Sequence, residues 1–232
     1  IGAIDINLGC SQYVYAHANA FALVKSNLAK RVLVMTGDTP SRIIDPDDRS
    51  VVPLFGDGGT AAIIEELGDG FGFEAFKFGT DGSGSDSLIW PESGLRKTQN
   101  INNSKNNYMK MNGQNIFIFT LKTVPKSLNI FLDEQKINID DIDFFAFHQA
   151  SKMIVDSIQK KLKIPNGKIN HIYSNRGNSG GSTVGISLSH ALKQGVIKPG
   201  SKVVISAFGV GLSWAHALLI WPEKEIPNFS VE

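Results

Sequence analysis

Apolar and polar positions alternate along the chain with two periods, one typical of strands and one of helices. Compact apolar runs that end in glycine or polar residues predict strands at residues 31–38, 60–64, 72–82, 141–148, 202–211 and 214–221. Apolar positions at helical spacing predict helices at residues 11–30, 113–135, 149–164 and 184–195. Because strands alternate with helices, we expect an α/β fold with a mainly parallel sheet.

Four local features add detail to this pattern. Residues 2–7 alternate apolar and polar side chains and predict a further strand. The continuous apolar run at 31–38 predicts a strand that is buried on both faces. Pro125 is expected to kink or divide the helix around it. Residues 81–107 are rich in serine, glycine and asparagine and predict a long surface excursion.

Two parts of the chain share one order of elements: a polar candidate residue, a helix of small residues, a strand and a second strand. The first part starts at Cys10 and the second at Asn178. A helix–strand–helix block at 111–170 precedes the second part only. We therefore divide the chain into residues 1–110 and 111–232, and expect a comparable block before residue 1 in the natural protein.

Composition narrows the class of protein. The chain has 232 residues, 42% of them hydrophobic, which suits one or two packed layers with a core. The formal net charge is +1, so no global field favours nucleic acid or an anionic membrane surface. No apolar run approaches the ~20 residues of a membrane span. The single cysteine excludes an internal disulfide and fits a reducing compartment.

Three residues at the ends of predicted elements are candidates for chemistry. Cys10 precedes a helix whose unpaired N–H groups favour the thiolate and lower the pKa; the alternative is an inert core cysteine. His148 ends a buried strand, where α/β sheets gather ligands, or is a core histidine. Asn178 lies in RGNSGGS, where small residues allow a substrate close to the backbone, or caps the following helix.

Two glycine-rich segments receive different interpretations. In FGVGLSW, the backbone N–H groups around Val210 suit an oxyanion, or they form an ordinary turn. The segment FGDGG at 55–59 lacks the Lys-Ser/Thr pair of a phosphate loop and leads into a strand, so we exclude that function. No spacing of cysteine and histidine predicts a zinc site.

Taken in order, these motifs resemble the 3-oxoacyl-[acyl-carrier-protein] synthase III family of the thiolase-fold superfamily. The matching stretches cover nearly the whole chain: AIDINLGCSQYVYA, DDRSVVPLFGDGGTAAI, MNGQNIF, FHQAS, RGNSGGSTVGISL and IKPGSKVVISAFGVGLSWA. The resemblance implies a duplicated, layered α/β fold with mainly parallel or mixed sheets and buried helices, whose first block is missing from this chain.

The resemblance also implies a decarboxylating Claisen condensation. A short acyl-CoA and malonyl-acyl-carrier protein would give 3-oxoacyl-acyl-carrier protein, CoA and CO2. Cys10 would carry the acyl group, and His148 and Asn178 would donate hydrogen bonds to the malonyl thioester oxygen. The backbone N–H groups of Cys10 and Val210 would bind the tetrahedral oxyanion.

Further positions match the family's substrate contacts. Arg49 matches a contact with the CoA adenine. The pantetheine tunnel matches Gly113, Phe117, Ala150, Ser151 and Phe208. The carrier-protein contact matches Gln149, Lys152 and Met153. The resemblance implies no metal and no cofactor, since CoA thioesters are substrates, and it implies a cytoplasmic homodimer without nucleic-acid or membrane partners.

Three residues depart from the family pattern. Ser151 stands where asparagine is usual, Met153 where many members have arginine, and Val210 where glycine is usual. A β-branched residue at position 210 restricts the backbone of the oxyanion turn. These departures point to a divergent synthase, with specialised lipid or secondary metabolism as the alternative to housekeeping fatty-acid initiation.

Other classes of protein stay open. A cysteine hydrolase of the papain type also has cysteine, histidine and asparagine in that order, although there the asparagine orients the histidine. Another thiolase-fold acyltransferase, such as a hydroxymethylglutaryl-CoA or quinolone-type synthase, differs mainly in its acceptor. The third alternative is non-enzymatic: an inactive fragment, or a structural half of a dimer.

Overall fold

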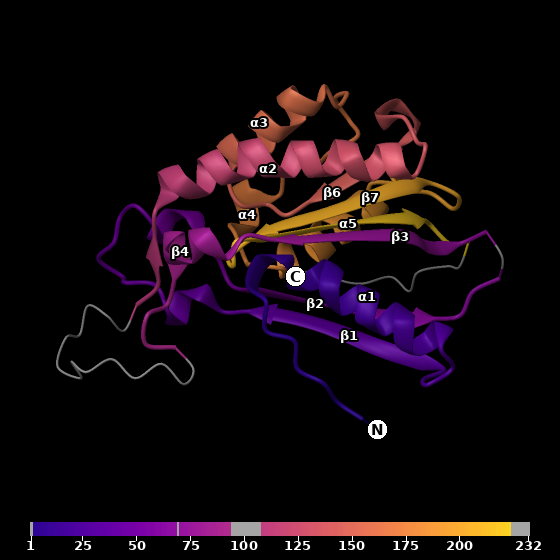
Figure 1. Ribbon diagram of the computed structural model, residues 1–232, viewed down its shortest axis with the longest axis horizontal. Coiled ribbons are helices and arrows are strands. Elements are labelled where there is room, and N and C mark those ends of the chain that lie inside the picture. Colours follow the sequence, from indigo (N-terminus) through magenta and orange to yellow (C-terminus); the bar gives the residue numbers. More distant parts are fainter. Residues whose placement is uncertain (1, 69, 94–107, 224–232) are drawn as a thin grey trace.

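The computed structural model describes residues 2–68, 70–93 and 108–223, which fold into alternating layers of helices and sheets (Figure 1). The helices are α1 (Gln12–Lys25), α2 (Gly113–Glu134), α3 (Lys152–Leu162), α4 (Tyr173–Arg176) and α5 (Ser182–Lys193). The strands are β1 (Arg31–Asp38), β2 (Gly58–Glu65), β3 (Gly72–Thr80), β4 (Leu88–Ile89), β5 (Lys110–Met111), β6 (Phe144–Phe147), β7 (Lys202–Gly209) and β8 (Ser213–Ile220).

The central layer is a four-stranded sheet in the order β3-β8-β7-β6. Strands β6 and β7 run parallel, whereas β3–β8 and β7–β8 are antiparallel. Helices α2 and α3 pack against one face of this sheet, and α1 and α5 against the other. The hairpin of β1 and β2 forms the next layer beyond α1 and α5. The α/β class is thus confirmed. The mainly parallel sheet is wrong, because β6–β7 is the only parallel pair among the described strands; the four-stranded sheet is mixed and the two-stranded sheets are antiparallel.

The repeated order of elements is visible in the structure. Helix α1 leads to the antiparallel pair β1 and β2, and helix α5 leads to the antiparallel pair β7 and β8. Both helices lie between the two sheets (Figure 1). Cys10 precedes α1 and Asn178 precedes α5, so the repeat places one candidate residue at the start of each inner helix.

The prediction that β1 is buried on both faces is wrong. Alternate residues of β1 are exposed, and the exposed fractions of Leu33 and Met35 are 56% and 72%. Ile63, the partner of Leu33 across the hairpin, is 60% exposed. One face of the β1–β2 pair packs on α1 and α5, while no other element of the described residues covers the opposite face.

The predicted strand at residues 2–7 is also absent. These residues form an extended segment that leaves the body of the molecule (Figure 1), and the exposed fraction of Ile4 is 76%. A strand needs a neighbour to complete its hydrogen bonds. Within the described ranges, residues 2–7 pair with no strand of any sheet.

Pro125 lies inside α2 without dividing it. Proline has no N–H, so the carbonyl four residues earlier, on Leu121, lacks its helical donor. The ammonium of Lys161 on α3 donates to that carbonyl at 2.8 Å. The predicted division of the helix is therefore wrong, and the kink stays a prediction. A side chain from the neighbouring helix replaces the missing hydrogen bond.

Within the ranges that the structure describes, no helix combines the length and apolar character needed to cross a membrane. Residues 81–93 follow the predicted surface excursion only in part: positions 81–83, 85, 86 and 90 are exposed, whereas Ser87 and Leu88 are buried. The segment contains a short 3₁₀ helix, Gly82–Ser87, and the two-residue strand β4. The remainder of that prediction, residues 94–107, lies outside the described residues.

Candidate active site

Cys10 lies buried in a short 3₁₀ turn, Gly9–Ser11, that continues directly into α1. The end of β7 passes so close that a Cβ at Gly209 would come within 2.8 Å of the Cys10 Sγ. Only glycine leaves room for the sulfur at this point. The turn around Val210, which the sequence predicts as an oxyanion site, therefore adjoins the candidate nucleophile.

The protonation state of Cys10 differs from the expectation. Burial raises the pKa of the Cys10 thiol to about 11, and the Asp38 carboxylate also raises it. The backbone N–H groups of Val210 and Cys10 act on the same sulfur and lower the pKa, but burial outweighs them. The lowered pKa predicted from the helix N-terminus is thus wrong, and the thiol is neutral at pH 7.

Val210 fits the turn that is predicted to bind the oxyanion because of the residue it packs against. A Cβ at Gly9 would lie 1.9 Å from Cγ1 of Val210. Gly9 also has a φ of +62°, which favours glycine. The missing side chain at position 9 leaves the room that the Val210 side chain fills, and the Val210 N–H still acts on the Cys10 sulfur.

His148 follows the last residue of β6, beside the end of the parallel strand β7. Its backbone N–H donates to the Ser206 carbonyl at 2.8 Å. Its buried ring meets the ring of Phe208 edge-on, with 5.4 Å between the centroids. Burial lowers the pKa of His148 to about 4, so the ring is neutral at pH 7. Since Phe208 directly precedes Gly209, His148 lies beside the segment that contacts Cys10.

Asn178 is buried in the turn before α5. Its Oδ1 accepts a hydrogen bond from the Gly180 N–H at 3.0 Å, which orients the carboxamide with Nδ2 as its donor group. The Gly180 carbonyl accepts from Thr183 Oγ1 at 2.9 Å. The same Thr183 oxygen lies 2.7 Å from Nδ1 of His148. Gly180 and Thr183 therefore connect Asn178 to His148.

The glycine-rich segment at 55–59 supports Asn178. The Asn178 N–H donates to the Leu54 carbonyl at 2.8 Å, and the Gly56 N–H donates to the Asn178 carbonyl at 3.1 Å. A Cβ at Gly56 would lie 2.3 Å from the Arg176 carbonyl oxygen, so the two segments can pair this closely only with glycine there. Sequence reasoning excluded a phosphate loop here but missed this support, because its partners are far apart along the chain.

Asp38, at the end of β1, is a second residue that sequence reasoning missed. Its carboxylate accepts from Gln12 Nε2 at 3.0 and 3.1 Å and from Ser182 Oγ at 3.2 Å. Burial raises the pKa of Asp38, while the Ser182 and Gln12 hydrogen bonds lower it. Gln12 and Ser182 begin α1 and α5, so Asp38 links the two helix starts that follow Cys10 and Asn178. The sequence feature that could have indicated Asp38 is its position as the charged residue at the end of the apolar run of β1.

The predicted substrate-binding positions lie in different environments. Arg49 is exposed, Gly113 begins α2, and the partly buried Phe117 and Ala150 pack against the core. Ser151 caps α3, accepting from the Ile154 N–H at 3.3 Å. The Ser151 hydroxyl thus serves to cap α3.

One predicted carrier-protein contact is wrong. The Gln149 side chain is fully buried and hydrogen-bonds to the backbone of Phe147, Asn170 and Ile172, so it has no surface to offer a protein partner. Met153 has an exposed fraction of 60%. Lys152 is exposed as well, but its ammonium is paired with Asp156 at 2.6 Å.

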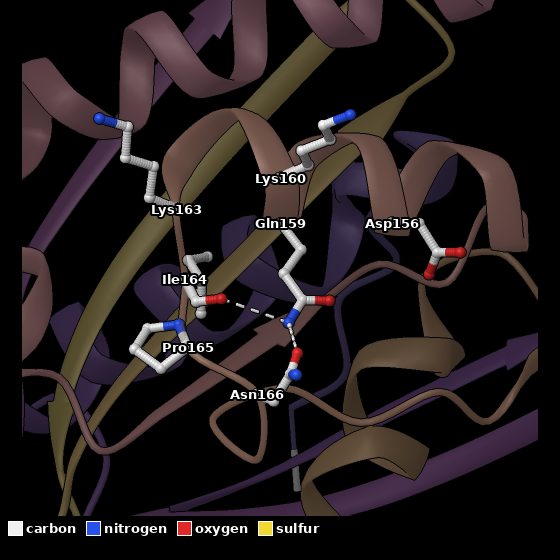
Figure 2. A pocket seen from close by; sticks show the side chains of 7 residues that line it. All are labelled: Asp156, Gln159, Lys160, Lys163, Ile164, Pro165 and Asn166. Carbon is white, nitrogen blue, oxygen red and sulfur yellow. Dashed lines mark hydrogen bonds between the residues drawn. The ribbon is translucent and has the colours of Figure 1, made fainter.

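A hollow of about 430 Å³ lies at the end of α3 (Figure 2). It is lined by Asp156, Gln159, Lys160, Lys163, Ile164, Pro165 and Asn166. Gln159 Nε2 donates to the Ile164 carbonyl at 3.3 Å and to Asn166 Oδ1 at 3.2 Å, as Figure 2 shows. These bonds close the end of the helix, and none of the predicted site residues borders the hollow.

Comparison with known proteins gives one consistent result. A family profile described as 3-oxoacyl-[acyl-carrier-protein (ACP)] synthase III matches residues 4–82, and the profile for the C terminal part of that synthase matches residues 132–221. Two curated relatives are named beta-ketoacyl-[acyl-carrier-protein] synthase III. The Fusobacterium nucleatum protein is 36% identical over 223 residues, and the Caldanaerobacter subterraneus protein is 34% identical over 221 residues.

These alignments cover 95% and 94% of this chain, and 68% and 67% of the two relatives. Comparison with a solved structure supports the same family. The 2.1 Å crystal structure of a 3-oxoacyl-(acyl-carrier-protein) synthase III is similar with a TM-score of 0.91 and 35% identity. That comparison covers 95% of this chain and 69% of the crystallised one.

Proposed function

Because this chain belongs to the 3-oxoacyl-[acyl-carrier-protein] synthase III family, we propose that its site condenses a short acyl-CoA with malonyl-acyl-carrier protein. The products are 3-oxoacyl-acyl-carrier protein, CoA and CO2. Cys10, His148 and Asn178 carry the reaction. The observation that supports these roles is the shared scaffold of Gly180, Thr183 and the Phe208–Val210 turn, which touches all three side chains.

In the first half-reaction, the Cys10 sulfur attacks the acyl-CoA carbonyl, and the CoA sulfur leaves. Negative charge develops on the carbonyl oxygen in the tetrahedral transition state. The backbone N–H groups of Cys10 and Val210, which lower the pKa of the thiol, receive that charge in this proposal. Because the thiol is neutral at rest, its proton must move to an acceptor as the new C–S bond forms.

In the second half-reaction, malonyl-acyl-carrier protein loses CO2 and leaves an enolate. The Nδ2 group of Asn178 would donate to the thioester oxygen, since Oδ1 accepts from the Gly180 N–H. A donor there stabilises a charge that grows in the transition state. The carbanion attacks the acyl carbon on Cys10, and the thiolate is expelled and protonated.

Separate measurement of the half-reactions tests this proposal. We expect Cys10→Ala to abolish acyl transfer from acyl-CoA while malonyl decarboxylation continues. Asn178→Ala should do the opposite: the acyl-enzyme forms, and decarboxylation slows by about 10²–10³. If Cys10→Ala still transferred acyl groups, the nucleophile would be misassigned.

The papain-type alternative predicts another pattern. In such a hydrolase, asparagine orients histidine, whereas here Asn178 bonds to Gly180, and Thr183 contacts the Nδ1 of His148. A hydrolase would cleave amides without CoA. Amide hydrolysis that depends on Cys10 and not on CoA would favour this alternative over the synthase.

The wider setting is part of the proposal. Residues 1–110 and 111–232 act as two related halves, supported by the repeated order of elements and by the two matching profiles. We propose a cytoplasmic homodimer on the basis of the family resemblance. The exposed Lys152 and Met153 belong to its carrier-protein contact, supported by their exposure next to His148 in sequence. Light scattering tests the dimer. Titration of carrier protein into the Lys152→Glu variant tests the contact.

A further inference from the structure

The carboxylate of Asp38, at the end of β1, joins the first residues of the two inner helices, α1 and α5. On the α1 side, Gln12 Nε2 donates to Oδ1 at 3.1 Å and to Oδ2 at 3.0 Å. On the α5 side, the Ser182 N–H donates to Oδ2 at 3.4 Å, and Ser182 Oγ donates to it at 3.2 Å. One side chain therefore holds both helix starts through bonds to a charged acceptor, which are stronger than bonds between neutral groups.

Two successive glycines let the start of α5 approach this carboxylate. A Cβ at Gly180 would lie 2.6 Å from Asp38 Cγ, and a Cβ at Gly181 would lie 2.8 Å from Gln12 Cγ. Gly180 also has a φ of +57°, which favours glycine. The start of α5 thus lies directly against the Asp38–Gln12 pair, and a side chain at either glycine would push the two helix starts apart.

Each helix start follows a residue of the proposed reaction. Cys10 lies in the 3₁₀ turn that continues into α1 at Gln12. Asn178 lies before α5, and its Oδ1 accepts from the N–H of Gly180, the residue that Asp38 touches. Gln12, Asp38 and Gly180 therefore connect the turn of the sulfur to the carboxamide.

We propose that Asp38 is a positioning residue that fixes the distance between the Cys10 turn and Asn178 for carbon–carbon bond formation. This inference rests on the proposed function, in which these two residues act on the two substrates of one condensation. Acylation uses the Cys10 side of the site and decarboxylation uses the Asn178 side, so each step tolerates a change in the distance between them. Condensation needs both sides, and a displacement of about 1 Å can slow such a step about 10²-fold.

The intermediate that follows decarboxylation has two fates. When CO2 leaves malonyl-acyl-carrier protein, the electron pair of the broken bond stays on the thioester enolate. With the acyl carbon of acyl-Cys10 in reach, the enolate carbon forms the new C–C bond and the Cys10 thiolate leaves. When the helix starts move apart, the same carbon takes a proton from water, leaving hydroxide and acetyl-acyl-carrier protein. Asp38 should therefore determine the number of condensations per CO2 released.

This ratio can be measured in the full gene product. Cys10 is first acetylated with acetyl-CoA, free CoA is removed, and malonyl-acyl-carrier protein labelled at its free carboxyl carbon is added. Released CO2 is counted against the 3-oxoacyl and acetyl products. The wild type should give a ratio of one, and Asp38→Ala a ratio below about one half. Asp38→Asn should recover most of the ratio, because its amide oxygen can accept from Ser182 while the Gln12 amide turns to accept from its NH2 group.

Asp143→Ala is the matched control. It removes a carboxylate that also joins two elements, accepting from the Lys202 N–H at 2.8 Å, but at the ends of β6 and β7 opposite to the site. We expect its ratio to stay at one. A smaller folded fraction lowers CO2 release and condensation together and leaves the ratio unchanged, so the ratio separates positioning from stability. If Asp38→Ala does not fold, Gln12→Met takes its place, since it removes only the bonds on the α1 side.

Three results would overturn the inference. The first is a ratio of one in the folded variant. The second is an equal loss in Asp38→Ala and Asp38→Asn, because the charge and not the link would then be decisive. The third is a folded Asp38→Ala that neither acylates nor decarboxylates, because Asp38 would then serve the single steps. Absence of acyl-Cys10 or of CO2 release in the wild type would instead contradict the proposed function.

Discussion

Replacing Gly9 by alanine tests the fit between the nucleophile's turn and the Val210 side chain. The new Cβ would lie 1.9 Å from Val210 Cγ1 and 3.3 Å from its Cβ. The first distance is far inside van der Waals contact, so Val210 or the turn must move. Overpacking of this kind costs about 1–3 kcal/mol.

The backbone adds a second cost. Gly9 has a φ of +62°, in the left-handed region that alanine adopts at a cost of about 1–2 kcal/mol. Together the two effects predict that Gly9→Ala lowers the free energy of unfolding by about 2–5 kcal/mol. The free energy of unfolding of a typical protein is about 5–15 kcal/mol, so this loss is a large fraction of it. The sum treats the two costs as additive.

Urea denaturation measures this loss, and two matched variants separate its parts. Gly195→Ala has the same backbone penalty, with a φ of +67°, but no atom lies within 4 Å of its Cβ position. Val210→Gly removes the contacting methyl group, so adding it to Gly9→Ala should recover the overpacking part, about 1–3 kcal/mol. If Gly9→Ala cost no more than Gly195→Ala, or if Val210→Gly brought no recovery, the steric argument would be refuted.

Three further predictions concern the helix, the thiol and the amide. Lys161→Met should lower the free energy of unfolding by about 1 kcal/mol, because it removes the donor to the Leu121 carbonyl. The loss should be smaller in a Pro125→Ala background, where the helical N–H returns, and equal losses in both backgrounds would contradict this explanation. Because burial raises the pKa of Cys10 to about 11, its rate of alkylation by iodoacetamide should be low at pH 7 and should rise about tenfold per pH unit toward pH 11. Mass spectrometry of the chain's single cysteine measures this rate, and a plateau below pH 8 would show an ionised thiol instead. Gly56→Ala should push the loop away from Arg176 and Asn178, so it should slow malonyl decarboxylation more than Cys10 acylation, with Gly37→Ala, which meets no atom within 4 Å, as the control; equal slowing of both steps would argue against a specific effect on Asn178.

The parts of the fold that depend on local pattern could be predicted from the sequence. The strand Arg31–Asp38 has the bounds that its apolar run predicts, and Cys10, His148 and Asn178 lie at element boundaries as expected. These features follow from periodicity and from residue types that begin or end helices and strands.

The remaining features depend on contacts between distant segments. The pKa of Cys10 rises because β7 and the body of the protein bury it, which no local pattern around position 10 reveals. Gln149 looks like a polar surface residue but fills a buried set of backbone hydrogen bonds. Thr183 stands inside a small-residue helix start, and its contact with His148 appears only when α5 packs beside β6.

The most direct test of the account is the mass of the Cys10 peptide through one catalytic cycle. The full gene product is first mixed with acetyl-CoA and then with malonyl-acyl-carrier protein. We predict an acetyl group on Cys10 that disappears after the second addition, with an equal amount of 3-oxoacyl-acyl-carrier protein formed. An unmodified Cys10, or an acetyl group that malonyl-acyl-carrier protein does not remove, would contradict it.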